Sequence, residues 1–241
     1  MCSSATEKRA GIIVQARLGS SRLPGKVLKP LVEGRTVLGY LLERLTFCQP
    51  AAKLIVATSL NPIDDPLAQQ IAAWKIAFFR GSESDCLERY YSAARQFDLE
   101  IVARVTADCP LVIPSIVEEM IQYFRRNYDR IDYLSNRQYT DFPEGLDVEI
   151  FKTDLLEEGV REAQRLDERE HINYFFLNRP TRYRLRYYNH GRGRDYSRFK
   201  LSIDDAADLD RVRALFSHRG LPIDFTFDQL ITALIAEETT P

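Results

Sequence analysis

Short apolar runs alternate with helix-like segments through the first half of the chain. Four runs rich in Val, Ile and Phe are the expected strands, at residues 11–15, 53–57, 76–79 and 101–105. Between them, apolar residues recur at three- and four-residue spacing, which predicts helices at residues 37–47, 66–74 and 85–97. This alternation predicts an α/β fold with a mainly parallel sheet and helices on both faces, because parallel neighbours need a crossover connection.

The second half of the chain is expected to be more mixed. Helices are predicted at residues 114–128, 153–165, 168–177, 205–216 and 226–236, strands at 131–134 and 182–188, and a short apolar run lies at 201–203. Residues 146–150 alternate apolar and acidic side chains, which is typical of a half-exposed strand. We expect a single domain over residues 1–241, in which the strand-rich excursion 133–200 covers the site or forms a dimer interface.

Composition excludes several classes of function. A net charge of −2 over 241 residues gives no basic field for non-specific nucleic-acid binding. The four cysteines lack zinc-ligand spacing and predict unpaired thiols in a reducing compartment; they are Cys2, Cys48, Cys86 and Cys109. The N-terminus lacks the apolar core of a signal peptide and no apolar run could span a membrane, so we expect a cytoplasmic protein.

The loop that follows the first predicted strand concentrates groups that bind phosphate. Arg17, Arg22 and Lys26 supply positive charge, and the Gly and Ser residues between them let backbone N–H groups approach an anion closely. The loop leaves the carboxyl end of a strand, where ligands bind in open α/β sheets. The alternative is a basic surface loop with a turn at Pro24 and Gly25.

Two aspartates suit the metal ion that phosphoryl and nucleotidyl transfer require. Asp108 closes the strand-like run that begins at Ile101, and Asp204 stands between the apolar run 201–203 and a predicted helix. Carboxylates at such positions can hold Mg²⁺ together with the oxygens of a nucleotide. Both also have a structural alternative, since Asp commonly precedes a turn or caps a helix, here with Asp208 close behind.

Five segments resemble the cytidylyltransferase family that activates acidic sugars, namely the deoxy-octulosonate (Kdo) and acylneuraminate enzymes and especially their spore-coat-polysaccharide-type relatives. The segments are residues 13–26, 79–83, 104–111, 142–149 and 202–209, and they occur in the family's order. The resemblance implies a Rossmann-like fold of the nucleotide-diphospho-sugar transferase type, dependence on Mg²⁺ and, commonly, a homodimer. It also implies that the anomeric hydroxyl of a sugar attacks the α-phosphorus of CTP and expels pyrophosphate.

The resemblance assigns roles to individual residues. The catalytic group is Arg17, Lys26, Asp108 and Asp204, with Asp108 and Asp204 as the metal ligands. The expected nucleotide-binding residues are Ala16, Arg17, Gly19, Ser20, Ser21, Arg22, Lys26, Thr58, Arg80, Gly81 and Ser82. The expected sugar-binding residues are Asn136, Glu144, Asp147, Glu149 and His171. Thr58 and residues 80–82 could equally be strand-end turn residues, and His171 could be a surface or capping residue.

The predicted sugar-binding segment departs from the Kdo-type enzymes, which carry a basic residue where this chain has Glu144. Asp147 and Glu149 add negative charge, so a carboxylate substrate would be repelled unless Arg137 or another arginine compensates. This favours an amino sugar or a neutral polyhydroxylated sugar. Arg182, Arg184 and Arg186 fall on one face of an alternating run and could meet a sugar carboxylate, a partner chain or solvent.

The sequence as a whole predicts an Mg²⁺-dependent cytidylyltransferase that makes a CMP-activated sugar for surface polysaccharide or glycoconjugate synthesis, without nucleic-acid or membrane partners. Two alternatives remain open: a glycosyltransferase of the same fold that uses a nucleotide-sugar donor, and a nucleotide-binding module without catalysis.

Overall fold

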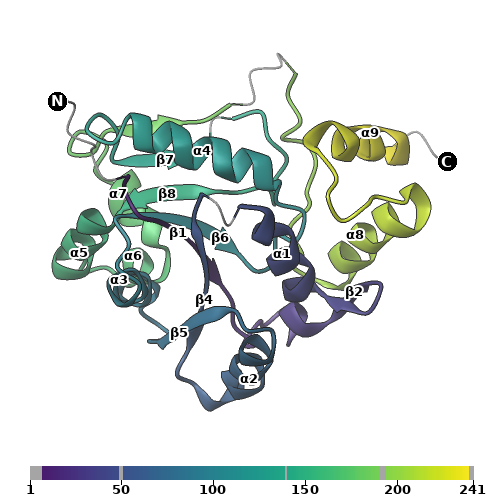
Figure 1. Ribbon diagram of the computed structural model, residues 1–241, viewed down its shortest axis with the longest axis horizontal. Coiled ribbons are helices and arrows are strands. Elements are labelled where there is room, and N and C mark those ends of the chain that lie inside the picture. The colour runs from purple at the N-terminus through teal and green to yellow at the C-terminus, as the bar shows by residue number, and fades with distance from the viewer. Residues whose placement is uncertain (1–6, 49–50, 139, 190–193, 239–241) are drawn as a thin grey trace.

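The structure, a computed structural model, describes residues 7–48, 51–138, 140–189 and 194–238 of the chain. Its central feature is a seven-stranded sheet with the order β5-β4-β1-β6-β8-β7-β9 (Figure 1). In that spatial order the strands are β5 (Ala77–Gly81), β4 (Lys53–Ser59), β1 (Ala10–Gln15), β6 (Ile101–Thr106), β8 (Glu149–Lys152), β7 (Tyr133–Ser135) and β9 (Leu185–Tyr187). Two further strands, β2 (Pro30–Val32) and β3 (Arg35–Thr36), form a separate antiparallel pair.

The predicted mainly parallel sheet is confirmed. Strands β5, β4, β1 and β6 are all parallel neighbours, so their carboxyl ends meet at one edge. Strand β8 runs antiparallel to both β6 and β7, and β9 is parallel to β7. The strand-rich excursion at residues 133–200 therefore extends the main sheet with three strands.

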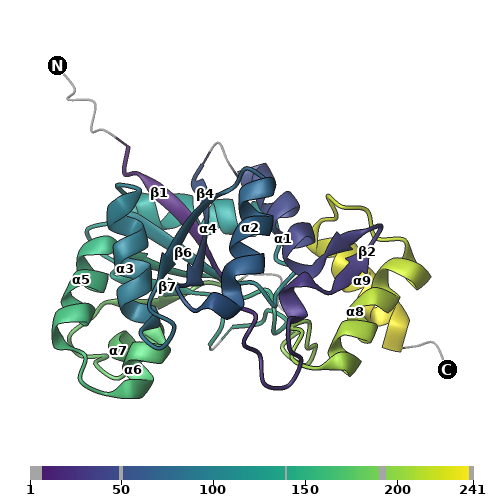
Figure 2. The same cartoon turned by 90° about the horizontal axis from the view of Figure 1, so that it is seen from below.

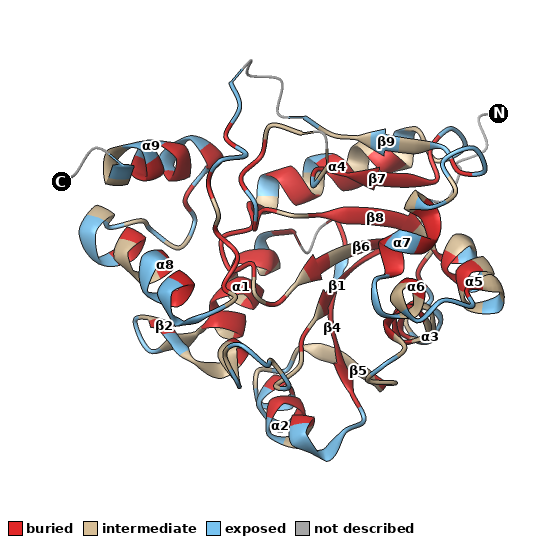
Figure 3. Cartoon of the chain, turned by 180° about the vertical axis from the view of Figure 1, so that it is seen from behind, coloured by how far each residue is buried: buried red, intermediate tan, exposed pale blue. Residues whose placement is uncertain are grey.

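Helices cover both faces of the sheet, because successive strand residues point to opposite sides. In β1, Ile12 and Val14 join one apolar cluster and Ile13 joins the other. The helices on the Ile13 side are α3 (Cys86–Gln96), α5 (Thr153–Glu162), α6 (Leu166–Glu170) and α7 (Ile172–Leu177) (Figure 2). The cluster on the Ile12 side takes the apolar faces of α1 (Val37–Leu45), α2 (Asp65–Ala73), α4 (Pro114–Arg126), α8 (Ala206–Arg219) and α9 (Phe227–Glu238). Figure 3 shows the strands at the centre of the sheet buried between these layers.

Two local predictions were wrong. Residues 146–150 do not form a half-exposed strand, because β8 begins at Glu149 and that side chain is buried against the guanidinium of Arg104. The short apolar run 201–203 forms no regular element, and an isolated bridge between Glu144 and Lys200 lies beside it. The helix expected at 168–177 is split into α6 and α7, because the backbone of His171 (φ −110°, ψ 89°) is not helical.

Two of the three arginines predicted to share one strand face, Arg182 and Arg184, form ion pairs on the surface. Arg182 pairs with Glu158 and Glu162, and Arg184 pairs with Asp132 at 2.6 Å. Three of the four cysteines are buried free thiols, at positions 48, 86 and 109, while Cys2 lies outside the described residues. Within the ranges that the structure covers, none of the helices combines the length and apolar character needed to cross a membrane.

Candidate active site

Charged side chains from three distant parts of the chain meet at the carboxyl ends of β1 and β6. The Nζ atom of Lys26 lies 2.6 Å from Oδ2 of Asp108 and 3.6 Å from Oδ1 of Asp204. Arg22 adds a second cation, with its Nη2 atom 2.7 Å from the same Oδ1 of Asp204. The structure thus brings two cations of the predicted phosphate loop onto the two predicted metal ligands.

The cations at this cluster favour the charged form of Asp108. Burial raises the cost of ionising Asp108, but the ammonium group of Lys26 and hydrogen bonds from Thr106 and the backbone together hold the pKa of Asp108 below its ordinary value of 3.8. The carboxylate of Asp204 has a further neighbour in Lys200, whose Nζ atom is 3.0 Å from Oδ2. At neutral pH the cluster therefore holds an ionised Asp108 among closely spaced positive groups.

The loop after β1 is folded by its own hydrogen bonds and by one buried carboxylate. The carbonyl oxygen of Leu18 accepts the N–H groups of Ser20 at 2.8 Å and Gly25 at 3.0 Å. Gly25 has a left-handed backbone (φ 68°), and the short helix η1 (Lys26–Leu28) begins directly after it. The N–H of Leu18 donates to Oδ1 of Asp64 at 2.7 Å. These hydrogen bonds fix the backbone position of Lys26 and the direction in which its side chain leaves the loop.

The position of Asp204 is set by two backbone contacts. The N–H of Ile203 donates to the carbonyl oxygen of Asp108 at 2.8 Å, which ties the two aspartate segments together. Gly145 packs against the same segment with φ 94°, and a Cβ atom there would lie only 2.3 Å from the backbone nitrogen of Ser202. Helix α8 is capped by Asp205 and not by Asp204, so the Asp204 side chain is left to face the cations.

A cavity of about 340 Å³ opens beside this cluster and is called the first cavity below. It is lined by Gln15, Arg17, Gly19, Ser20, Ser21, Arg22, Lys26, Val27, Thr106, Ala107, Asp108, His171 and Asp204. Within the part of the chain that the structure describes, the backbone N–H groups of Gly19, Ser21 and Arg22 have no hydrogen-bond partner. Most of the predicted loop residues therefore line one cavity, and several of their donors are available to an anion.

A second cavity of about 330 Å³ adjoins the first and shares Arg22, Thr106, Asp108, His171 and Asp204 with it. Its remaining lining residues are Arg104, Cys109, Arg137, Glu144, Asp147, Glu149 and Ser202. Burial raises the pKa of Asp147 to about 6, although the charge of Arg137 acts in the opposite direction. The hydroxyl of Ser202 donates to Glu144 at 2.8 Å. Four of the five predicted sugar-binding residues thus line one cavity.

Other predicted site residues line neither cavity: Ala16, Thr58, Arg80, Gly81, Ser82 and Asn136. Thr58 is fully buried in β4. Arg80 pairs with Asp65 at 2.7 Å. Asn136 is buried, and its amide donates to the carbonyl oxygen of Leu146 at 2.9 Å. These three predicted site residues therefore do not line either cavity.

Sequence reasoning missed four residues that build the site. Gln15 and Thr106 end β1 and β6 and line the first cavity, so the rule that ligands bind at strand ends could have found them. Arg104 lies in β6 and reaches the second cavity. Asp64, which holds the loop, gave no signal, because an acidic residue just before a helix is an ordinary surface feature.

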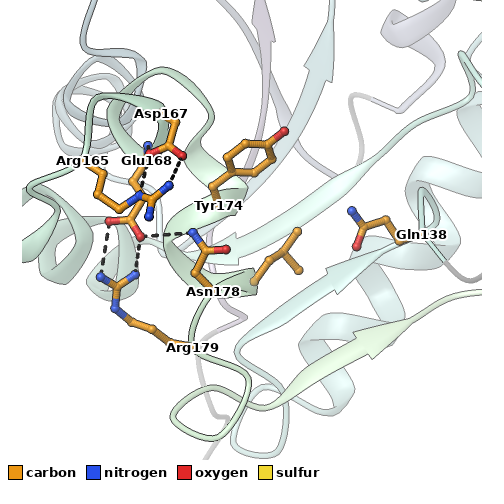
Figure 4. A pocket seen from close by; sticks show the side chains of 8 residues that line it. Gln138, Arg165, Asp167, Glu168, Tyr174, Asn178 and Arg179 are labelled. Atoms are coloured by element: carbon orange, nitrogen blue, oxygen red, sulfur yellow. Dashed lines mark hydrogen bonds and ion pairs between the residues drawn. The ribbon is translucent and has the colours of Figure 1, made fainter.

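A third hollow of about 580 Å³ lies beside α6 and α7 and shares no lining residue with the first two cavities (Figure 4). Its charged side chains are paired with one another: Arg179 with Glu168 at 2.7 Å, and Arg165 with Asp167 at 2.6 Å. Asn178 also donates to Glu168, at 3.3 Å. Because its charges are already compensated, this hollow lacks the converging cations that distinguish the first cavity.

Comparison with known proteins agrees with this geometry. The fold is an α/β sheet whose cation–carboxylate cluster lies at the carboxyl ends of the strands, where open α/β proteins bind their ligands. The family model for cytidylyltransferases matches residues 11–224, so the chain belongs to the cytidylyltransferase family and is a nucleotidyltransferase. The predicted family, fold and enzyme class are therefore confirmed.

Individual relatives fit the same assignment. The chain is 31% identical over 228 residues to the spore coat polysaccharide biosynthesis protein SpsF of Bacillus subtilis, covering 92% of each protein. It is 29% identical over 119 residues to an 8-amino-3,8-dideoxy-manno-octulosonate cytidylyltransferase of Shewanella amazonensis, covering 48% of this chain and 47% of the relative. A solved cytidylyltransferase structure from Leptospira borgpetersenii superposes with a TM-score of 0.90, 33% identity and coverage of 96% of each chain.

Proposed function

We propose that this nucleotidyltransferase transfers CMP from CTP to a sugar and releases pyrophosphate. The observation that carries the proposal is the meeting of Arg22 and Lys26 with Asp108 and Asp204 in a cavity whose wall is the loop after β1. Cations and free N–H donors gathered at one point suit a triphosphate, whose charge grows on the α-phosphate and the leaving pyrophosphate during transfer.

The first cavity would hold the triphosphate. The N–H groups of Gly19, Ser21 and Arg22 have no partner among the described residues, so donating to phosphate oxygens would break no existing hydrogen bond. Arg17, Arg22 and Lys26 would pair with the phosphates. Arg17 is only weakly engaged, at 3.9 Å from Glu170, so its guanidinium can turn to a ligand at little cost.

Asp108 and Asp204 fit a magnesium ion in their chemistry, since carboxylate oxygens are ligands that Mg²⁺ prefers. Both already face one cation, the ammonium group of Lys26. The ranges that the structure describes contain no group of three or more His, Cys, Asp and Glu side chains able to hold a metal, so phosphate oxygens and water would complete the ligand set. When bound, Mg²⁺ would neutralise charge on the phosphates and favour attack at the α-phosphorus.

The second cavity would receive the acceptor sugar, because it adjoins the first and shares both aspartates with it. A hydroxyl of the sugar forms the new bond to the α-phosphorus, and the bond from that phosphorus to the leaving pyrophosphate breaks. The name of the relative SpsF supports a role in surface polysaccharide synthesis. We also propose that the enzyme acts in the cytoplasm as a homodimer.

The test is a pyrophosphate-release screen of four nucleoside triphosphates with Mg²⁺ against nonulosonic acids, octulosonic acids and amino sugars. The proposal expects release that depends on both CTP and one class of sugar. A parallel arm supplies nucleotide sugars, which a glycosyltransferase of this fold would consume instead. The proposal would be contradicted if no pair of CTP and a sugar gave pyrophosphate release. It would also be contradicted if the enzyme consumed only nucleotide sugars.

A further inference from the structure

Cations of the chain itself contact the two carboxylates that are proposed to bind metal. The Nζ atom of Lys26 lies 2.6 Å from Oδ2 of Asp108 and 3.6 Å from Oδ1 of Asp204, so one ammonium group spans both side chains. Arg22 lies 2.7 Å from the same Oδ1 atom of Asp204, and Lys200 lies 3.0 Å from its Oδ2 atom. Among the described residues, these contacts engage three of the four carboxylate oxygens of the pair.

The ammonium group of Lys26 is held between the aspartates by more than charge. An ammonium group has three N–H donors. Two of them are used at hydrogen-bond distance, on Asp108 at 2.6 Å and on the carbonyl oxygen of Ile203 at 2.7 Å. The side chain of Lys26 is 12% exposed. Lys26 is therefore a fixed positive charge between the two carboxylates and not a loose surface cation.

The charges of this cluster cancel. Asp108 and Asp204 bring two negative charges, and Lys26 and Arg22 bring two positive charges, before Lys200 is considered. A divalent cation that arrives alone therefore meets no net negative charge. It can reach both carboxylates only if Lys26 leaves them, and ion pairs near a protein surface are several-fold stronger than the same pairs in water. The cluster thus disfavours a metal ion that comes without other ligands.

A triphosphate changes this balance, because it offers both cations another partner. Lys26 and Arg22 line the first cavity together with the loop whose N–H groups can donate to phosphate. The side chain of Arg22 is 64% exposed, so its contact with Asp204 is weak and easily exchanged. Hydrogen bonds from Lys and Arg to phosphate oxygens are charge-assisted and strong. Each cation that turns to the phosphates leaves a carboxylate oxygen available to a metal ion.

We propose that Lys26, assisted by Arg22, forms an autoinhibitory contact that keeps a free divalent cation off Asp108 and Asp204 until a triphosphate binds. The inference rests on the proposed function, in which these two aspartates are the metal ligands. Lys26 exchanges the aspartates for phosphate oxygens when the nucleotide enters. Binding of the metal ion and of the nucleotide is therefore coupled through this one side chain.

The experiment measures binding of Mn²⁺ to the protein alone, without CTP or sugar, from the electron paramagnetic resonance signal of the free ion. The main variant is Lys26→Met, which removes the charge and keeps a long apolar side chain. The matched control is Lys29→Met, because Lys29 lies outside both cavities and has no ion pair within the described ranges. A double variant, Lys26→Met with Asp108→Asn, tests whether a gain in affinity acts through the site. Thermal unfolding checks that each variant is folded.

We expect Lys26→Met to bind Mn²⁺ about 10-fold or more tightly than the wild type, because the two carboxylates then face the ion without an ammonium group between them. Lys29→Met should change the affinity by less than about 2-fold, since its charge is screened by solvent. Adding Asp108→Asn should abolish the gain. Mn²⁺ should also raise the melting temperature of Lys26→Met more than that of the wild type.

A second variant keeps the test decisive if Lys26→Met does not fold. Arg22→Gln removes the exposed cation from Asp204 and should tighten Mn²⁺ binding by about 3-fold. The inference is overturned if the folded variants of Lys26 and Arg22 bind Mn²⁺ no more tightly than the wild type. It is also overturned if Lys29→Met gains as much affinity as Lys26→Met, because overall charge would then explain the effect.

The outcomes separate this inference from the proposed function. Pyrophosphate release by the wild type, together with unchanged Mn²⁺ affinity in the folded variants, refutes the autoinhibitory contact alone. A gain in Lys26→Met, with no pyrophosphate release by the wild type on any sugar, supports the contact and refutes the proposed transfer. A gain that survives Asp108→Asn refutes Asp108 as a metal ligand, and this inference with it.

Discussion

The fully buried carboxylate of Asp64 makes a sharp prediction about how the phosphate loop is held. Asp64 lies at the end of the short helix η3 (Pro62–Asp64), and its Oδ1 atom accepts the N–H of Leu18 at 2.7 Å. Its Oδ2 atom accepts the hydroxyl of Ser59, at the end of β4. One side chain thus ties the start of the loop to the end of a neighbouring strand, and the substitution Asp64→Ala removes both ties.

The expected loss follows from these two hydrogen bonds. A hydrogen bond to a charged group contributes roughly 1.5 to 3 kcal/mol, and the N–H of Leu18 would be left without its partner. We therefore expect Asp64→Ala to lower the free energy of unfolding by about 3 to 5 kcal/mol, a large part of the roughly 5 to 15 kcal/mol that holds a domain folded. Asp64→Asn keeps an oxygen for Leu18 and should cost about 1 to 2 kcal/mol.

Urea unfolding followed by circular dichroism measures the loss, and the KM for CTP reports on the loop. The matched control is Asp65→Asn, one residue away, where the carboxylate is half-exposed and pairs with Arg80 at 2.7 Å. The control should change the stability by less than about 1 kcal/mol. Equal effects of Asp64→Ala and Asp65→Asn on stability, or an unchanged KM for CTP in a folded Asp64→Ala variant, would refute the reasoning.

Three further predictions concern the site and its supports. Asp108→Asn should lower kcat about 100-fold or more in a protein that stays folded, because the proposed metal ligand is lost, whereas the exposed Asp210→Asn should leave pyrophosphate release unchanged. Gly145→Ala should cost about 3 kcal/mol, seen as a fall of about 6 to 12 °C in melting temperature, since φ is 94° and the new Cβ would overlap the backbone of Ser202; a wild-type melting curve would count against the packing argument. Asp147 has a folded pKa of about 6 against an ordinary value of 3.8, so its effect on stability is fully favourable below pH 3.8 and is lost as the pH rises through 6. Asp147→Asn should therefore raise the free energy of unfolding at pH 8 by up to roughly 3 kcal/mol and leave it unchanged at pH 3.5. Denaturation measured at both pH values checks this, and an equal gain in stability at the two would contradict the assignment.

The parallel strands of the first half could be predicted from local sequence patterns. The four parallel strands β5, β4, β1 and β6 coincide closely with the four apolar runs of the first half, because a strand covered on both faces must be apolar throughout. The loop cations could be predicted for the same kind of reason. They follow a buried strand directly, and the carboxyl end of such a strand is where an open α/β sheet binds its ligands.

Other features could not be predicted, because they depend on contacts between distant segments. The acidic alternation around Glu149 was taken as a sign of exposure, yet the partner that allows its burial, Arg104, is 45 residues away in the sequence. Thr58 and Arg80 were expected in the site, but Thr58 is buried in β4 and Arg80 pairs with Asp65. Nothing local distinguishes Asp64 from an ordinary acidic residue at a helix start.

The sequence by itself determined the family, the α/β sheet and the chemical character of the phosphate loop, since these follow from residue type and from short-range periodicity. Only the tertiary structure decided that Lys26 contacts both Asp108 and Asp204, that Arg104 neutralises Glu149, and that Asp64 anchors the loop. The physical reason is that electrostatic and hydrogen-bond energies depend on distances in space, which residue order does not give until the sheet brings the strand ends together.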